Sequence, residues 1–469
     1  MHGQPLTLKS LWRIVRHPVD AEKLAILDAR WREIPQVLRD YPMQGFGRQS
    51  TGCGAIIGIN PRCDFSCTGC YLGKEANQIP NLPLAGVLAQ LDALRAHLGP
   101  KANVQITDGE VTLRPLEELL TVLRHARAIG VIPMVMTHGD RLRLEPGLLE
   151  MLMVEGGLTE ISIHVDITMR GRDGYPVPKS ELELMPLRDE FAALIRTARK
   201  RTGLPLRAAT TMTITEQNLP DVAEVVRWLI RNRDTFGLIS FQPLAMVGRT
   251  RKELHGVTPQ SLWDEVNKAT REFGLDLPNE PGPIHFGHSD CTRVVPLIGY
   301  TGRNRPVKLM QLLRSAPEDV EFYAGYSANR LSGMNYRDDR WLERKARTLG
   351  LFLKAPRWAA GPARRWVGSR LRGELGFGLA GLIARLITGR GRLEALTLTS
   401  HHFMNPDEAA TPLGQERLAA CVFKLPVKGE MVPMCKMNAG GARENFYRQM
   451  LSSPAGQPTP LPVIEGTGS

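Results

Sequence analysis

Between residues 51 and 250, short apolar runs alternate with longer stretches in which apolar positions recur every three or four residues. The short runs are typical of strands and the longer stretches of amphipathic helices. This pattern predicts six strands, at residues 55–59, 104–107, 132–136, 161–165, 206–213 and 238–242. It also predicts helices between them, among which are 84–98, 115–128, 181–200 and 219–232.

Alternation of strands and helices with crossovers of this length indicates a parallel sheet. Six such units favour an α/β fold of the partial (βα)6 TIM-type barrel over an open six-stranded sheet, although the periodicity is compatible with both. In either arrangement the chemistry collects at the C-terminal ends of the strands. We therefore expect the functional residues of segment 51–250 to follow its strands.

The remainder of the chain divides by composition into segments that flank the predicted barrel. Residues 1–50 have the pattern of amphipathic helices, which would form an N-terminal cap or a membrane-surface segment. Behind the barrel we expect a linker and auxiliary region (251–340), a basic amphipathic segment (341–393), a C-terminal α+β extension (394–451) and a disordered tail (452–469).

Composition excludes several classes of protein. The 469 residues are 42% hydrophobic and 23% charged, which is typical of globular chains and not of collagen-like, fibrous or wholly disordered ones. Seven cysteines are too few, and odd in number, for a secreted disulfide framework. No apolar stretch reaches the roughly 20 residues of a membrane-spanning helix, and the N-terminus lacks a signal-peptide pattern. We expect a cytoplasmic protein.

The net charge of +12 is concentrated in one segment. Residues 341–392 contain 12 Lys and Arg against two Glu, with Trp, Leu and Phe interleaved. Such a segment indicates an anionic partner: a phospholipid surface, a phosphorylated substrate or nucleic acid. A solvated basic surface without a partner is the alternative.

The clearest chemical motif is CDFSCTGC, which directly follows the first predicted strand. It places Cys63, Cys67 and Cys70 at the spacing C-x3-C-x2-C. Three thiolates can ligate three irons of a [4Fe–4S] cluster and leave the fourth iron open to a further ligand. Structural thiols or a zinc site are the alternatives, but zinc usually takes four protein ligands.

This motif, at this place, resembles that of the radical S-adenosylmethionine (SAM) superfamily. The resemblance implies that Cys63, Cys67 and Cys70 hold a [4Fe–4S] cluster whose open iron binds the amino and carboxylate groups of SAM. It also implies an electron donor such as flavodoxin or ferredoxin. One-electron cleavage of SAM would then yield a 5′-deoxyadenosyl radical that abstracts hydrogen from an unactivated carbon. One departure is Gly69, where many members have an aromatic residue; here the aromatic Tyr71 follows the third cysteine.

The second predicted strand ends in Thr-Asp-Gly-Glu, which resembles the GGE motif of the same superfamily. The resemblance implies that Asp108, Gly109 and Glu110 contact the methionine moiety of SAM. Weaker candidates for cofactor binding follow the later strands: Ser162, His164, Asp166, Thr211, Asn218 and Gln242, with His138 after strand three. For each of these, a buried polar group of the barrel interior is the alternative. No catalytic side chain is assigned.

The remaining cysteines are Cys53, Cys291, Cys421 and Cys435. Four thiols would fully ligate a second [4Fe–4S] cluster, and plain thiols without metal are the alternative. Because Cys53 stands at the N-terminal end of the first predicted strand, we expect such an auxiliary cluster to lie far from the radical site.

The segments around these cysteines also resemble the tetraether lipid synthase-like radical SAM proteins. The resemblance rests on TGCGAIIGINPRCDFSC, FGHSDCT, and HHFMN followed by CVFKLPVKGEMVPMCKMN. It implies an auxiliary cluster, a long-chain lipid substrate and carbon–carbon bond formation between two fatty-acyl tails. The chain lacks several metal-binding cysteines of the archaeal enzymes.

The leading functional hypothesis is therefore a radical SAM enzyme of lipid biosynthesis that lies on the inner face of the membrane. Its substrate would be the acyl chain of a membrane lipid. A peptide-modifying or RNA-modifying radical enzyme with an auxiliary cluster is the alternative. A non-enzymatic iron–sulfur sensor is the least favoured hypothesis, because of the Asp-Gly-Glu element.

Overall fold

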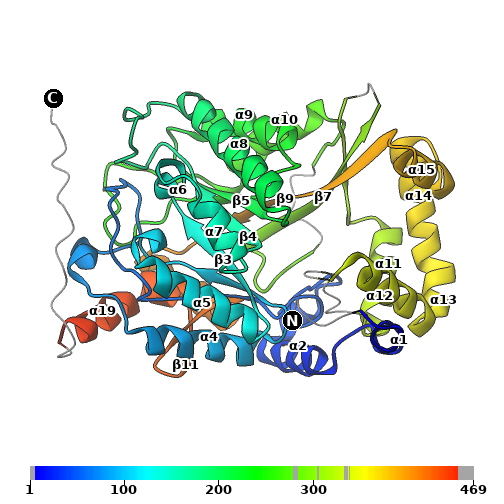
Figure 1. Cartoon of the computed structure of the whole chain (residues 1–469), viewed down its shortest axis with the longest axis horizontal. Coiled ribbons are helices and arrows are strands. Elements are labelled where there is room, and N and C mark those ends of the chain that lie inside the picture. The colour runs from blue at the N-terminus through cyan, green and yellow to red at the C-terminus, as the bar shows by residue number, and fades with distance from the viewer. Residues whose placement is uncertain (1–5, 278–283, 304–305, 332–335, 337–338, 453–469) are drawn as a thin grey trace.

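A single curved sheet with helices packed on its outer face dominates the structure (Figure 1). The computed structural model describes residues 6–277, 284–303, 306–331, 336 and 339–452. Eleven strands in these residues form one sheet with the order β11-β10-β1-β2-β3-β4-β5-β6-β9-β7-β8. The sheet curls into a half barrel, which confirms the predicted partial barrel.

Strands β1 to β6 pair in parallel and in sequence order. They are β1 (Cys53–Ile56), β2 (Asn103–Ile106), β3 (Ile132–Thr137), β4 (Glu160–His164), β5 (Arg207–Ile214) and β6 (Phe236–Pro243). The helices between them are α4 (Leu84–Leu98), α5 (Leu116–Ala128), α6 (Asp140–Leu144), α7 (Leu148–Val154), α8 (Met185–Thr202) and α9 (Val222–Arg231). All six predicted strands and the four named helices are present, with shifted ends.

The C-terminal half of the chain widens this sheet at both edges. β9 (Gly391–His401) pairs in parallel with β6, and β10 (Phe423–Val427) pairs in parallel with β1. The antiparallel strands β7 (Thr292–Gly302) and β8 (Lys308–Gln311) continue beyond β9, and β11 (Glu430–Pro433) continues beyond β10. The C-terminal α+β extension is therefore continuous with the barrel sheet, and the expected boundary between residues 393 and 394 falls inside β9.

The main hydrophobic core lies between the outer face of the parallel strands and helices α4 to α9. Ile56, Ile106, Val135 and Ile161 are fully buried there. Parallel strands covered on both sides carry such continuous apolar residues. Because the helices cover the outer face, the inner face and the C-terminal strand ends remain available for a cavity.

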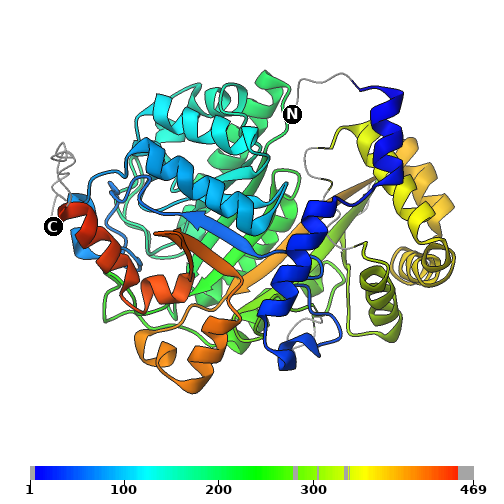
Figure 2. The same ribbon diagram turned by 90° about the horizontal axis from the view of Figure 1, so that it is seen from below.

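The other described helices lie at the ends and on one side of the barrel (Figure 2). They are α1 (Leu8–Arg16), α2 (Ala21–Glu33), α3 (Gln36–Arg39), α10 (Pro259–Glu272), α11 (Pro317–Ala328), α12 (Trp341–Lys354), α13 (Pro356–Trp358), α14 (Arg364–Leu375), α15 (Leu379–Ile387), α16 (Pro406–Ala409), α17 (Pro412–Ala419), α18 (Met434–Asn438) and α19 (Ala442–Ser452).

Helices α11 to α15 and α1 form a helical lobe beside the barrel, on the right of Figure 1. In this lobe α1 packs on α12, where Gly350 lies against the backbone of Val15. Among the described helices, none has both the length and the hydropathy that crossing a bilayer requires. The tail from residue 453, predicted to be disordered, lies outside the described residues.

Candidate active site

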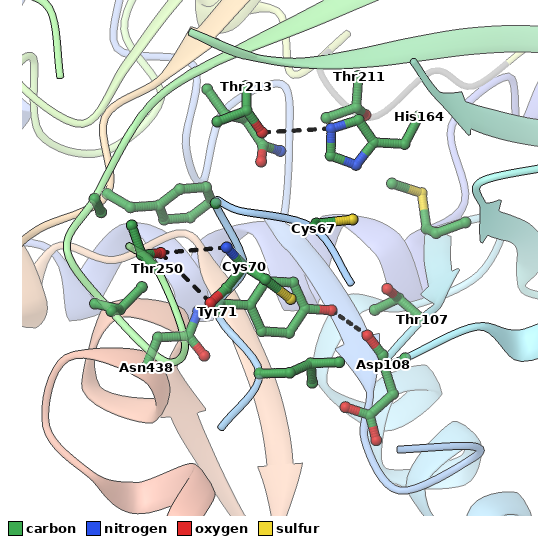
Figure 3. A pocket seen from close by; sticks show the side chains of 18 of the residues that line it. Cys67, Cys70, Tyr71, Thr107, Asp108, His164, Thr211, Thr213, Thr250 and Asn438 are labelled. Atoms are coloured by element: carbon green, nitrogen blue, oxygen red, sulfur yellow. Dashed lines mark hydrogen bonds between the residues drawn. The ribbon is translucent and has the colours of Figure 1, made fainter. Parts of the chain in front are cut away.

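A cavity of about 200 Å³ opens at the C-terminal ends of the barrel strands (Figure 3). The side chains of Cys63, Cys67 and Cys70 line one side of it. Residues from β2 to β6 line the opposite side, and residues that follow β9 and β10 complete the wall. The three predicted cluster ligands therefore face one cavity, together with most of the other predicted site residues.

The cysteine loop has little regular structure and is held by single hydrogen bonds. The Cys63 backbone N–H donates to Asn77 Oδ1 at 2.9 Å, and the Thr68 N–H donates to the Thr168 carbonyl at 2.8 Å. The Phe65 N–H donates to Cys63 Sγ at 3.4 Å, as backbone donors often do for a metal-bound thiolate. This scaffold fixes the thiols before any metal binds.

The thiols of this loop suit an iron–sulfur cluster. Burial raises the pKa of Cys67 to about 12 and that of Cys63 well above its usual value, so both are protonated without metal. Metal binding must expel those protons, and a cationic cluster compensates the buried thiolates. Three thiols from one loop match a [4Fe–4S] cluster with one open iron.

One further grouping of donor atoms occurs beside this loop. Cys63, Asp64 and His138 place ligand atoms within 4.8 Å of one another. However, His138 Nε2 lies 2.8 Å from Asp64 Oδ1, and its ring stacks on Phe65 at 3.8 Å. An ion pair accounts for the closeness of Asp64 and His138 without a metal. His138, a candidate from the sequence, does line the cavity.

The loop after β2 explains why the motif needs glycine. The Gly109 N–H donates to the Asn60 carbonyl at 2.9 Å, and the Glu110 N–H donates to the Arg62 carbonyl at 2.8 Å. A Cβ on Gly109 would lie less than 3 Å from the carbonyl oxygens of Pro61 and Arg62. Glycine therefore lets this loop lie directly on the backbone that precedes Cys63.

Glu110 is fixed in the cavity wall. Its Oε1 accepts hydrogen bonds from Thr112 N–H at 3.0 Å, Thr112 Oγ1 at 2.6 Å and Thr137 Oγ1 at 2.7 Å. Its Oε2 accepts one from the His138 N–H at 2.9 Å. The orientation of the carboxylate is thus fixed by four hydrogen bonds.

Asp108 points away from the position that the sequence suggested for it. Its carboxylate accepts hydrogen bonds from Arg443 Nη1 at 2.7 Å, from the Gly58 N–H at 2.6 Å and from the Tyr447 hydroxyl. The Asp108 side chain has no solvent exposure, and burial raises the pKa of its carboxyl. Its backbone carbonyl accepts a hydrogen bond from Tyr71 (Figure 3). Asp108 therefore positions the loop, and its carboxylate is already committed.

Arg443 and Tyr447 were missed by sequence reasoning. Both lie on α19, more than 330 residues from Asp108. The Arg443 guanidinium also lies 4.6 Å from the centre of the Tyr71 ring. No local pattern in the sequence indicates this contact. The C-terminal helix therefore holds both the Asp-Gly-Glu loop and the residue that follows the third cysteine.

The polar wall of the cavity comes from β4, β5 and β6. Ser162, His164, Thr211 and Gln242, all candidates from the sequence, line it. Ser162 Oγ lies 3.2 Å from Thr211 Oγ1, which fixes both hydroxyls. These groups line the cavity together with the cysteine loop, so they border any molecule bound in it.

Two predicted cofactor ligands lie behind this wall. The Asp166 carboxylate lies 2.6 Å from His164 Nε2 and accepts the Thr213 N–H at 2.8 Å. Burial opposes its ionisation, yet its pKa is lowered because His164 pairs with it. Asn218 donates to Glu181 Oε1 at 2.7 Å and to the Thr213 carbonyl at 2.9 Å. Neither residue belongs to the cavity lining, so both act as buried supports of β4 and β5.

Another part of the wall is apolar. It consists of Leu244 and Val247 after β6, Phe403 and Met404 after β9, Phe423 in β10 and Met434 in α18. A Cβ on Gly69 would lie 2.9 Å from Leu244 Cδ1. Glycine at position 69, where the superfamily often has an aromatic residue, therefore makes room for this apolar wall.

We call the other four cysteines, Cys53, Cys291, Cys421 and Cys435, the seam thiols; Cys291, Cys421 and Cys435 lie within electrostatic range of one another. Cys53 lies opposite Phe423 in the register of β1 and β10, and alternation puts Cys421 on the same face as Phe423. Burial and, to a lesser degree, the nearby thiols of Cys435 and Cys291 raise the pKa of the Cys421 thiol to about 12. Arg417 Nε lies 3.4 Å from Cys291 Sγ.

One seam thiol lies nearer the candidate active site than we expected of the group. Cys435 lines the same cavity as Cys63, Cys67 and Cys70. The expectation rested on Cys53 alone, at the start of β1. The chain segments after β9 and β11 bring Cys435 to the cavity wall.

Comparison with known proteins agrees with this geometry. Residues 57–229 match the Radical SAM superfamily, and this range contains the three cluster cysteines, the Asp-Gly-Glu loop and β2 to β5. A search of curated proteins finds no match. The chain thus carries a radical SAM domain over less than half of its length.

Among solved structures, the chain resembles histidine-tagged anSMEcpe with bound AdoMet, with a TM-score of 0.34 and 12% identity, over 47% of this chain and 59% of that chain. Native anSMEcpe with bound AdoMet and Cp18Cys peptide gives a TM-score of 0.33 and 12% identity, over 47% and 59%. The tryptophan synthase α2β2 complex of Pyrococcus furiosus gives 0.26 and 13%, over 48% and 75%. These low TM-scores say nothing about the substrate. The chain spans 59% of the first structure's length.

Proposed function

We propose that this chain is a radical SAM enzyme that abstracts hydrogen from an acyl chain of a membrane lipid. When bound, the cluster supplies one electron to the sulfonium of SAM, which gives methionine and a 5′-deoxyadenosyl radical. The observation that carries the radical chemistry is a cavity with three thiols on one side and the fixed Glu110 carboxylate on another.

The residues of the cavity have distinct parts in this proposal. Cys63, Cys67 and Cys70 hold the cluster, and Glu110 accepts hydrogen bonds from the SAM ammonium. His164 and the hydroxyl of Thr211 stand where they can meet the polar groups of SAM. The apolar wall excludes water, so that an alkyl C–H can be held close to the radical and side reactions are suppressed. Joining two such chains through a carbon–carbon bond is the outcome suggested by the resemblance to tetraether lipid synthases.

The lipid substrate is supported by exposed apolar residues on the helical lobe. On α12, Trp341, Leu342, Leu349, Phe352 and Leu353 are between 43% and 69% exposed. At 3.6 residues per turn these positions fall within an arc of about 120°, which makes one continuous stripe. A soluble helix normally buries such a stripe, so the exposed one favours an apolar contact.

A second helix of the lobe repeats this pattern, and cations surround both. On α15, Leu379, Ile383, Leu386 and Ile387 are between 38% and 80% exposed at i, i+4, i+7 and i+8. Arg357 and Arg364 are exposed on α13 and α14. Apolar stripes edged by arginine are typical of helices that lie in the interface of an anionic membrane.

We further propose that the seam thiols hold a second [4Fe–4S] cluster. Four thiols are the ligand set of a closed cluster. Cys291, Cys421 and Cys435 lie within electrostatic range of one another although they come from distant parts of the chain, and Cys53 pairs in register with Phe423, two residues after Cys421. Arg417, beside Cys291, would stabilise the thiolates. Because Cys435 reaches the cavity, this cluster would stand beside the substrate.

The first test is anaerobic reconstitution followed by iron counting and by assay of 5′-deoxyadenosine with dithionite and SAM. About eight irons per chain support two clusters, whereas about four leave the seam thiols without one. Turnover stimulated by anionic phospholipid vesicles supports a lipid substrate. Turnover stimulated only by peptide or RNA contradicts it, and no 5′-deoxyadenosine with an intact cluster contradicts the radical chemistry itself.

The membrane contact is tested with paired substitutions. Phe352→Ser with Leu353→Ser should abolish flotation with vesicles of phosphatidylglycerol, because both side chains belong to the stripe on α12. Leu144→Ser with Val154→Ser is the matched control, since both are 52–61% exposed but lie on α6 and α7 of the barrel. Equal loss of flotation in both pairs would contradict a specific lobe contact.

A further inference from the structure

A second cavity, of about 760 Å³, lies behind the cysteine loop. It is separated from the candidate active site by the segment after β6, and Arg249 and Thr250 line both cavities. Thr68, which stands between Cys67 and Cys70 in the sequence, also lines it. The outer cavity is therefore one layer of backbone away from the first cluster site.

Hydrogen bonds join this separating segment tightly to the cysteine loop. The Arg251 N–H donates to the Thr68 carbonyl at 2.9 Å, and the Arg249 N–H donates to the Cys70 carbonyl at 3.0 Å. The Cys70 N–H donates to Thr250 Oγ1 at 3.2 Å (Figure 3). Gly248 has a φ of +59°, and a Cβ there would lie less than 3 Å from the Cys70 and Tyr71 carbonyls. This close approach provides a short bonded route from the outer cavity to a cluster ligand.

The outer cavity is strongly basic. Lys74, Arg170, Arg251 and Lys252 line it together with Arg249, against one acid, Glu253. Lys74, Arg251 and Lys252 are exposed. In the part of the chain that the structure describes, these three form no ion pair. The cations are thus unneutralised and accessible, in contrast to most arginines of the barrel surface, such as Arg227 and Arg196.

We propose that this outer cavity is the docking site for an acidic protein that donates single electrons to the first cluster. The proposal rests on the proposed radical SAM function. Complementary charge speeds association and orients the partner, and the concave basic surface can take an acidic protrusion close to the cluster. One electron passes at each encounter, so the donor is oxidised by one electron and the cluster is reduced by one; no bond forms or breaks.

Binding of oxidised flavodoxin to the full chain tests the proposal without any turnover. Replacing two exposed cations, Arg251→Glu with Lys252→Glu, should raise the Kd at least about tenfold at low salt. Arg357→Glu with Arg364→Glu changes the net charge equally on the helical lobe and should leave the Kd within about twofold. The wild-type Kd should rise steeply with ionic strength. Equal weakening in both variants, or in neither, overturns the proposal.

Reductant dependence separates this proposal from the proposed function. In the Arg251→Glu, Lys252→Glu variant, 5′-deoxyadenosine formation driven by reduced flavodoxin should fall about tenfold. Formation driven by dithionite with methyl viologen, a cationic mediator, should be unchanged. Loss with both reductants would mean that the substitutions damage the cluster site and would overturn docking here. Absence of product in the wild type with every reductant would instead contradict the proposed function.

Discussion

Cys63, Cys67 and Cys70 lie in one short loop after β1, whereas the seam thiols come from β1, from the residue before β7, from the segment before β10 and from α18. Both groups contain buried thiols with raised pKa values, and one seam thiol, Cys435, lines the same cavity as the first group. The first group is visible in the sequence as a spaced motif. The second becomes a group only when the two edges of the half barrel approach each other.

This difference teaches that sets of cysteine ligands can arise in two ways: from the spacing of residues in one loop, or from tertiary contacts between distant segments. A loop motif preserves its ligand geometry as long as its own backbone is held. A set drawn from distant segments depends on every strand pairing between them, and here on the pairing of β10 with β1. The second site should therefore be the more easily disturbed by changes elsewhere in the chain.

The largest expected effect comes from Cys67→Ala. Removing one of three ligands should prevent the first cluster from forming and abolish 5′-deoxyadenosine production. If the two sites are independent, the iron content should fall from about eight to about four per chain, with the remainder at the seam. Iron analysis with electron paramagnetic resonance checks this. Retained 5′-deoxyadenosine would show that Cys67 is no ligand.

Cys435→Ala should give the reciprocal result. Iron should again fall to about four per chain, but the dithionite-driven cleavage of SAM should persist, because the cysteine loop is untouched. Lipid conversion should be lost, since Cys435 lines the cavity on its apolar side. The same assays measure both outcomes. If the wild-type protein holds only about four irons per chain, the seam thiols bind no cluster and the proposed second site is contradicted.

Arg443→Leu tests how independent the first site is of the C-terminal chain. It leaves the Asp108 carboxylate buried without its cation, which should lower the free energy of unfolding by about 3–5 kcal/mol. SAM affinity should also fall, because the Asp-Gly-Glu loop loses its support. Urea denaturation and isothermal titration with SAM measure the two effects.

The control for Arg443 is Arg196→Ala. Arg196 forms an ion pair with Asp234 at 2.7 Å, and both side chains are 43–45% exposed. Solvent screening limits such a pair to about 0–1 kcal/mol. Similar losses for the two substitutions would contradict a special part for Arg443.

Arg417→Gln should have the smallest effect of the four. It removes the donor to Cys291 Sγ and the hydrogen bond to the His402 carbonyl, which is 2.7 Å long. We expect a loss of about 1.5–3 kcal/mol in stability, as for hydrogen bonds to charged groups. Iron loading at the seam should slow while the first cluster loads normally. An equal slowing at both sites would show that the two sites are coupled.

The barrel strands could be predicted because each carries its own local signal. β3 ends one residue after the predicted 132–136, and β4 is shifted by one residue at both ends from the predicted 161–165. β9 and β10 were not predicted, although β9 alternates apolar and polar residues. Such a pattern does not say with which other strand a segment pairs. Their partners, β6 and β1, lie far away in the sequence, and only the folded chain decides such pairings.

The candidate active site likewise contains residues that the sequence indicated and contacts that only the tertiary structure shows. Glu110 was a candidate from the resemblance to the GGE motif, and Ser162, His164, Thr211 and Gln242 were candidates from their places on the later strands; all of them line the cavity. The orientation of one further residue could not be predicted: the position of Asp108 in the motif suggests a cofactor contact, but its carboxylate turns to α19. A buried carboxylate is stable only when it is paired with a cation or hydrogen-bonded. Here the cation is Arg443, on a helix near the other end of the chain.

The sequence by itself determined the alternating strands and helices, the three-cysteine loop and the glycine that follows β2, because hydrophobic periodicity and ligand spacing act over a few residues. Only the tertiary structure decided the widening of the sheet at both edges, the gathering of the seam thiols and the buried contact between Asp108 and Arg443. These depend on pairings between residues hundreds of positions apart, where the gain from burial and hydrogen bonding is collective and leaves no local pattern to read.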